Sequence, residues 1–144
     1  LFWHHQWHTP TNYDGPAFNE PSRAMLGYGS ISGKAIATDI ATPAVGDRFS
    51  AYFRTTVNLA QDHDWLLVEI LADDGGIFYI DGKATIFELI GKDDYTGLTD
   101  AAGQEGSPKF VVVDGLSAGE HTLAFSLHNF TSDSSDIGFD LQIS

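Results

Sequence analysis

The predicted fold follows from one stretch of sequence, residues 65–88, which reads WLLVEILADDGGIFYIDGKATIFE. Along residues 65–72 the side chains fall alternately on two faces, because successive residues of a β-strand point to opposite sides. Residues 77–80 are β-branched and aromatic and favour a second strand. Asp81-Gly82 is the two-residue signal of a type I′ turn, so it predicts a hairpin that leads into a third strand at 83–88.

A second turn signal separates the first two of these strands. It is Asp73-Asp74-Gly75-Gly76, in which glycine adopts positive φ at little cost and aspartate bonds its own backbone. The stretch therefore predicts a three-stranded meander with one apolar face. A second sheet is then needed to cover that face.

Short strands account for most of the remaining sequence. Residues 49–59, 121–128 and 136–143 alternate between apolar and polar side chains, and 110–113 is an apolar run typical of a strand buried on both faces. Residues 1–30 contain three prolines and predict irregular structure, apart from a short strand at 23–29 that runs into a glycine turn. About nine strands without a convincing helix predict an all-β protein, an antiparallel β-sandwich of the jelly-roll kind.

The composition indicates a single acidic domain spanning residues 1–144. Seven lysines and arginines against 20 aspartates and glutamates give a formal charge of −13, which repels nucleic acids and anionic membranes. The absence of cysteine from the sequence excludes disulfides and thiolate chemistry. The sequence starts without Met or a signal peptide, and we expect a module excised from a longer multidomain protein.

Several segments follow the order of a known family. They are MLGYG (25–29), YFRTT (52–56), DDGGIFYIDG (73–82), LSAGEHTL (116–123) and SSDIGFDL (134–141). Together they resemble the galactose-binding-like β-sandwich modules appended to secreted bacterial glycoside hydrolases, polysaccharide lyases and phosphoesterases. The resemblance covers residues 24–144. It implies a galactose-binding-domain-like fold, an extracellular location and a neighbouring catalytic domain in the parent chain.

The segment around Asp73 and Asp74 is also similar to the lectin domain of the anthrax protective-antigen type. That resemblance implies that the paired aspartates hold a Ca²⁺ ion, which in turn grips sugar hydroxyls. Asn129 and Asp133 are the candidates for the remaining calcium loop. Carboxylate and carbonyl oxygens are the ligands that Ca²⁺ prefers. The alternative is a turn in which the aspartates bond backbone amides and hold no ion.

Five side chains are candidates for direct contact with a saccharide, namely Trp3, Trp7, Tyr28, Tyr95 and His128. A tryptophan face stacks on the C–H surface of a sugar ring, and its edge can donate a hydrogen bond. The tyrosines and the histidine fall at strand ends or in loops, where binding residues concentrate. The alternative for both tryptophans is that they close one end of the sandwich.

Two further features are interpreted as structural. The histidines of residues 4–8 would share a metal ion only in a helix, and no following periodicity supports one. A solvated terminal segment is therefore expected there. Trp65, beside Asp62-His63-Asp64, is interpreted as a staple between a loop and a strand.

The sequence predicts no catalysis, because it contains no Gly-x-Ser-x-Gly, His-Glu-x-x-His or phosphate-loop motif. It predicts a carbohydrate-binding module that holds a secreted polysaccharide-degrading enzyme near its polysaccharide or oligosaccharide, with Ca²⁺ as a candidate ion. Nucleic acid and membrane are not expected as partners. The alternatives are a structural spacer or docking sandwich without glycan affinity, and a stand-alone enzyme with a jelly-roll cleft.

Overall fold

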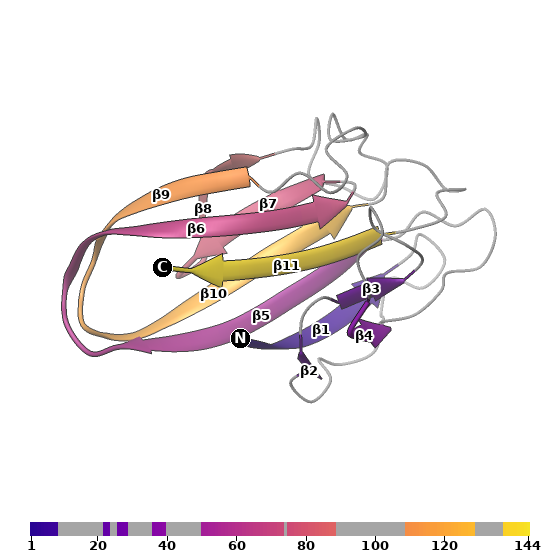
Figure 1. Cartoon of the computed structure of the whole chain (residues 1–144), viewed down its shortest axis with the longest axis horizontal. Helices are drawn as coiled ribbons and strands as arrows, with labels where there is room; N and C mark the ends of the chain where they lie inside the picture. Colours follow the sequence, from indigo (N-terminus) through magenta and orange to yellow (C-terminus); the bar gives the residue numbers. More distant parts are fainter. Residues whose placement is uncertain are drawn as a thin grey trace.

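The computed structural model describes residues 1–8, 22–23, 26–28, 36–39, 50–73, 75–88, 109–128 and 137–144. These ranges contain eleven β-strands arranged in two sheets (Figure 1). The predicted all-β sandwich is confirmed, while the jelly-roll connection pattern stays a prediction. Within the same ranges, no helix is long and apolar enough to cross a membrane.

The first sheet has six strands in the order β2-β1-β5-β10-β7-β8, and all its pairings are antiparallel. Its strands are β1 (Phe2–His8), β2 (Ser22–Arg23), β5 (Ser50–Leu59), β7 (Gly75–Ile80), β8 (Lys83–Glu88) and β10 (Gly119–His128). The centre of the sheet is the long pair β5 and β10, which is in register from Gly119↔Leu59 to His128↔Ser50.

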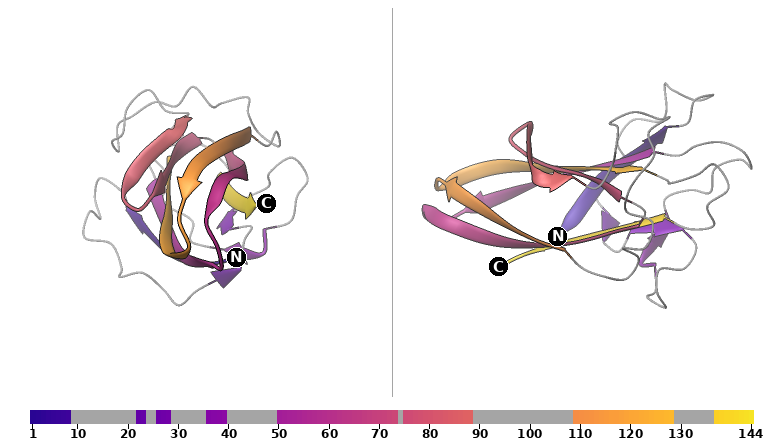
Figure 2. Two further views of the ribbon diagram at one scale, coloured as in Figure 1. Left: turned by 90° about the vertical axis from the view of Figure 1, so that its left-hand side faces the viewer. Right: turned by 90° about the horizontal axis from the view of Figure 1, so that it is seen from above.

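The second sheet has five strands in the order β4-β3-β11-β6-β9. Its strands are β3 (Leu26–Tyr28), β4 (Thr38–Asp39), β6 (His63–Asp73), β9 (Lys109–Leu116) and β11 (Ile137–Ile143). The β3–β4 pair is parallel and the others are antiparallel. Figure 1 shows β6, β9 and β11 in front of β5 and β10, and the right-hand view of Figure 2 shows the two sheets as separate layers.

The core between the sheets is built around Phe139 of β11. Its ring stacks on Phe53 of β5 at a centroid distance of 4.6 Å and on Phe125 of β10 at 4.5 Å. Trp3 of β1 meets the same ring edge-on at 5.0 Å. Such aromatic pairs stabilise a core by about 0.5–1.5 kcal/mol beyond the burial of their area. The predicted alternation is confirmed in β5, β6, β10 and β11, where every second residue turns into this core.

The predicted meander of residues 65–88 is wrong in its first half. β6 pairs with β9 and β11, whereas β7 pairs with β8 and β10, so the chain changes sheets between Asp73 and Gly75. Alternation tells which face a side chain occupies but not which strand lies beside it. The second half is confirmed. Asp81 and Gly82 have φ of 50° and 77°, as a type I′ turn requires, and Ile80 pairs with Lys83.

The prediction of irregular structure is also wrong for residues 2–8. β1 is a seven-residue strand in register with β5 from His4↔Arg54 to His8↔Ser50. The expected solvated segment therefore forms part of a sheet. Four residues of a strand span about 14 Å, so the backbone holds His4 and His8 too far apart for the helical metal pair considered from the sequence.

Candidate functional site

Exposed apolar side chains gather on the outer face of the five-stranded sheet. Among the described residues, Trp65 is 61% exposed, Phe110 61% and Val112 54%, and all three come from the neighbouring strands β6 and β9. Together with the partly buried Leu67 they form what we call the β6–β9 face. The sheet that carries it is turned towards the viewer in Figure 1.

The sequence placed Phe110 and Val112 in a strand buried on both faces, and this prediction is wrong. β9 is the edge strand of its sheet, and of residues 110–113 Val111 and Val113 turn towards the core. A continuous apolar run therefore has one wet side here. Contiguous exposed apolar groups of this kind commonly mark a binding surface.

The register of the two strands orders the face into three cross-strand pairs. Trp65 lies opposite Asp114, Leu67 opposite Val112, and Glu69 opposite Phe110. Each aromatic ring thus faces a carboxylate residue, and an aliphatic pair lies between them. Trp65 and Phe110 are offset by four residues along the strands, which corresponds to about 14 Å.

The face ends where another segment covers the same sheet. Leu71 lies two positions beyond Glu69 on the same side of β6, but it is only 5% exposed and packs against Ile36. By contrast, Trp65 is mostly exposed and Leu67 is only partly buried. The exposed apolar part of the outer surface therefore lies on β9 and the first half of β6, next to the polar residues Asp140 and Gln142 of β11.

A hollow of about 530 Å³ lies beside Trp65. It is lined by residues 61–67 and by Ser144, whose backbone pairs with that of Leu67 through hydrogen bonds of 2.9 and 3.0 Å. The lining combines the indole ring with the polar side chains of Gln61 and Asp62. Such a site can stack an apolar ring face and accept hydrogen bonds from hydroxyl groups at its rim.

One rim residue is held in place by the neighbouring turn. Asp62 Oδ1 accepts a hydrogen bond of 2.7 Å from the backbone N–H of Ala118. This bond ties the β5–β6 connection to the β9–β10 connection. The end of the face that carries Trp65 is therefore fixed from both of its strands.

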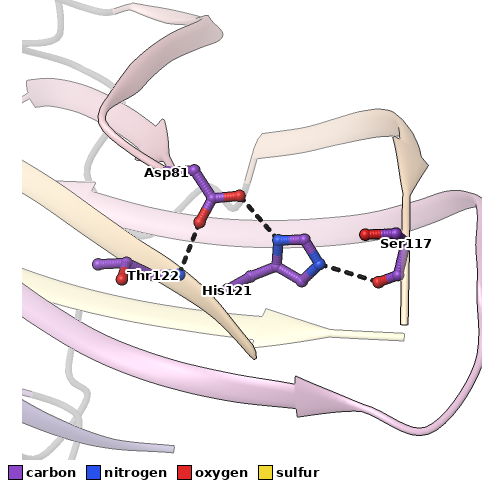
Figure 3. Close-up of polar contacts among 4 residues, drawn as sticks. All are labelled: Asp81, Ser117, His121 and Thr122. Carbon is purple, nitrogen blue, oxygen red and sulfur yellow. Dashed lines mark hydrogen bonds and ion pairs between the residues drawn. The ribbon is translucent and has the colours of Figure 1, made fainter. Parts of the chain in front are cut away.

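His121 forms the best-defined polar cluster among the described residues (Figure 3). Its Nδ1 lies 2.7 Å from Oδ2 of Asp81 and its Nε2 lies 2.9 Å from the carbonyl oxygen of Ser117. The other oxygen of Asp81 accepts a hydrogen bond of 2.9 Å from the N–H of Thr122. The cluster ties the β7–β8 turn to the start of β10.

The same hydrogen bonds shift both titrations. The bond to Asp81, followed by that to Ser117, raises the pKa of His121 despite its burial. The bonds from His121 and from the N–H of Thr122 lower the pKa of Asp81. Because both ring nitrogens are engaged, the imidazole has none left to act as a general base. The cluster is therefore a structural lock.

Two of the predicted saccharide contacts are corrected by their burial. Trp3 is fully buried in the core because β1 turns it inward against Phe139, so its ring offers no face to a sugar. Its position agrees with the alternative that it closes the sandwich. His128 is 2% exposed and meets Tyr52 edge-on at 6.3 Å, so it too is enclosed by the protein.

The other three predicted contacts stay untested. The backbones of Trp7 and Tyr28 lie in β1 and β3, where they pair with Ala51 and Ile137, but their side chains lie outside the described residues. Tyr95 lies outside them altogether.

Of the four predicted calcium ligands, the structure describes only the backbone of Asp73. Asp73 ends β6 and pairs with Gly138, but its side chain lies outside the described residues, as do Asp74, Asn129 and Asp133. In the part of the chain that the structure describes, no group of three histidine, cysteine or acidic residues could hold a metal ion.

The sequence reasoning missed Trp65 and Phe110 as exposed partners. The signal was present in part, since alternation puts Trp65 on the face opposite Leu66 and Val68. What it could not supply was the position of β9 at an edge beside β6, which follows from the topology.

No protein-family model matches the chain, and no curated protein matches its sequence. Its fold resembles part of a β-glucosidase from Kluyveromyces marxianus in complex with glucose, with a TM-score of 0.60 at 9% identity. It also resembles part of the GH31 α-xylosidase from Xanthomonas citri, with a TM-score of 0.53 at 10% identity. The likenesses cover 99% and 96% of this chain but only 17% and 13% of those enzymes. At such identities they show the fold alone.

Proposed function

We propose that the chain is a non-catalytic carbohydrate-binding module and that its β6–β9 face binds the saccharide. The observation that carries this proposal is the pair of exposed aromatic rings, Trp65 and Phe110, on adjacent strands of one sheet. Burial of an aromatic ring is strongly favourable, so two exposed rings joined by the apolar pair of Leu67 and Val112 favour a ligand that covers them.

The proposed mechanism combines ring stacking with hydrogen bonds to hydroxyl groups. Indole and phenyl faces pack on the C–H surface of a sugar, and the carboxylates beside them accept hydroxyl hydrogen bonds. Sites on strands are held more rigidly than sites on loops, which reduces the entropy lost on binding. Each contact is weak. The module would act by keeping a catalytic domain close to a polymeric substrate.

The fold comparison supports this direction without carrying it. The two structural neighbours described above are glycosidases, and the K. marxianus enzyme was solved with glucose. A neighbouring catalytic domain in a secreted, bacterial polysaccharide-degrading enzyme is part of the proposal and stays a prediction.

Calcium is a separate element of the proposal. Asp73 and Asp74, with Asn129 and Asp133, would supply the oxygen ligands that Ca²⁺ prefers. A bound ion would stabilise the end of the sandwich where the chain crosses between sheets.

Affinity electrophoresis against a panel of polysaccharides tests the main proposal, with Phe110→Ala compared with Phe2→Ala. Both phenylalanines are 61% exposed, but Phe2 lies on β1 in the other sheet. We expect the wild type to be retarded by at least one polysaccharide, Phe110→Ala and Trp65→Ala to lose about tenfold or more in affinity, and Phe2→Ala to match the wild type. A wild type that is unretarded in every gel contradicts the proposal. Steady release of reducing sugar contradicts its non-catalytic part.

A docking sandwich without glycan affinity is the second candidate. It is favoured by the edge position of β9, because an exposed apolar face on an edge strand also suits a neighbouring domain. This candidate expects no retardation by any polysaccharide.

A further inference from the structure

The β6–β9 face carries the same pair of groups twice. Trp65 of β6 lies opposite Asp114 of β9, and Phe110 of β9 lies opposite Glu69 of β6. Since the strands are antiparallel, each contributes one aromatic ring and one acid, and the two pairs are related by an approximate twofold rotation. Directly opposed cross-strand side chains have Cβ atoms about 5 Å apart, so each carboxylate lies at the edge of a potential stacking site.

The spacing of the two pairs sets the length of the ligand. Trp65 and Phe110 are four residues apart along the sheet, about 14 Å, and a single sugar ring cannot reach both. Leu67 and Val112 form a continuous apolar floor between them. The face therefore suits a chain of linked sugars lying along the strands.

The charges of the face set the chemistry of the ligand. On the described outer side of β6, β9 and β11 the charged residues are Glu69, Asp114 and Asp140, and neither lysine nor arginine occurs there. Lys109 belongs to β9 but pairs with Ile70, which places it on the opposite side of the strand. With a formal charge of −13 on the whole chain, a saccharide bearing carboxylate or sulfate groups would be repelled.

Resting on the proposed function above, we propose that the β6–β9 face selects an uncharged oligosaccharide chain that contacts Trp65 and Phe110 at once. Asp114 and Glu69 set this preference. An ionised carboxylate only accepts hydrogen bonds, so it accepts them from sugar hydroxyls and repels other anions.

The test compares each uncharged polysaccharide that retards the protein with its own carboxymethylated and hydroxyethylated derivatives. The hydroxyethyl derivative controls for bulk without charge. At low ionic strength we expect the carboxymethylated polymer to bind at least about tenfold more weakly than the hydroxyethylated one. In about 1 M salt, where the Debye length falls to about 3 Å, we expect most of the difference to disappear.

Variants assign the selectivity to the two carboxylates. Asp114→Asn and Glu69→Gln should each reduce the discrimination about fivefold, because each removes one like charge at close range. Glu120→Gln is the matched control, since Glu120 is an exposed acid on β10 of the other sheet, and it should leave the discrimination unchanged. Thermal unfolding of each variant checks that the fold is intact.

Calorimetry with an oligosaccharide ladder of the retarding polymer tests the length requirement. Affinity should rise with chain length until both aromatic rings are covered, and in Phe110→Ala the rise should stop at a shorter chain. If the affinities of the wild type and of Phe110→Ala stop rising at the same chain length, the inference is overturned.

The remaining outcomes separate this inference from the proposed function. Equal binding of the charged and uncharged derivatives overturns the inference and leaves the proposed function intact. Glycan binding that survives the Trp65→Ala/Phe110→Ala double substitution overturns the inference and also the placement of the saccharide on the β6–β9 face. No retardation by any polysaccharide overturns both. A dimer in light scattering that dissociates in the double variant shows that a second copy covers the face, and it also overturns the inference.

Discussion

Trp3 and Trp65 show how position in a strand decides what a tryptophan contributes. Trp3 is fully buried against Phe139, whereas Trp65 is mostly exposed. We expect Trp3→Ala to lower the free energy of unfolding by about 3–5 kcal/mol, because it leaves a large cavity in the core. Trp65→Ala should change it by less than about 0.5 kcal/mol. Urea denaturation of the two variants measures the difference, and equal losses would contradict the assigned burial.

His121 and Asp81 give the stability a defined dependence on pH. The folded pKa of His121 is raised above 6.5, so its contribution is complete below pH 6.5 and is lost as the pH rises through that raised value. The folded pKa of Asp81 is lowered below 3.8, so its contribution is present above pH 3.8 and is lost as the pH falls. The pair therefore stabilises the fold most between about pH 3.8 and 6.5.

The measurement is the thermal midpoint of the wild type, His121→Gln and Asp81→Asn from pH 3 to pH 9. This pH range brackets the usual pKa values of histidine and aspartate. In each variant we expect a lower midpoint in the stabilising window and a flatter decline on its alkaline side. His63→Gln removes a histidine outside this cluster and serves as the control. If the thermal midpoint of His121→Gln falls at alkaline pH as steeply as that of the wild type, the His121–Asp81 pair does not stabilise the fold.

Among the elements, β7 depends on a glycine where it meets β10. A Cβ at Gly76 would collide with the carbonyl oxygen of Ser126 and lie 2.5 Å from Cε1 of Phe125. We expect Gly76→Ala to cost about 3 kcal/mol or more, because the backbone of β10 must move. Gly82→Ala, in the turn after the same strand, meets no atom within 4 Å but keeps a φ of +77°, so it should cost only about 1–2 kcal/mol. Urea denaturation measures both, and equal costs would contradict the close approach of β7 to β10.

Most strands and one turn were predictable from the sequence, whereas the partners of the strands were not. Alternation predicted β5, β10 and β11, because every second residue of each strand packs into the core and must be apolar or small. The turn chemistry of Asp81-Gly82 predicted the β7–β8 hairpin, since few sequences tolerate two positive φ values. Partners were not predictable in the same way. Asp73 to Gly76 has the composition of a hairpin turn, yet the chain crosses there to the other sheet.

The candidate site was less predictable than the fold. Trp65 and Phe110 are 45 positions apart in the sequence and come to lie on one face only through the β6–β9 pairing. β1 was missed for a related reason, because the strand partner that stabilises it, β5, is distant in sequence. Long-range pairing decided both cases, and local pattern does not encode it.

At the scale of the whole molecule, the crossover between sheets joins two distant parts of the chain. Asp73 pairs with Gly138 at the start of β11, and Gly75 pairs with His128 at the end of β10. His128 and Gly138, which lie close to either side of segment 129–136 in the sequence, therefore adjoin the crossover. The proposed calcium ligands Asn129 and Asp133 belong to that segment of the sequence, and Asp73 and Asp74 belong to the crossover.

Calcium should therefore stabilise the whole sandwich rather than one strand. At a concentration about 100 times its dissociation constant, an ion that binds only the folded state adds about 2.7 kcal/mol to the free energy of unfolding. We expect the thermal midpoint to rise with Ca²⁺ and to return with EDTA, and we expect Asp73→Asn/Asp74→Asn to abolish the rise while Glu120→Gln keeps it. Calorimetric titration should show the same loss of binding. A midpoint indifferent to Ca²⁺, or a rise that survives in the double variant, leaves the two aspartates as turn residues that bond backbone amides.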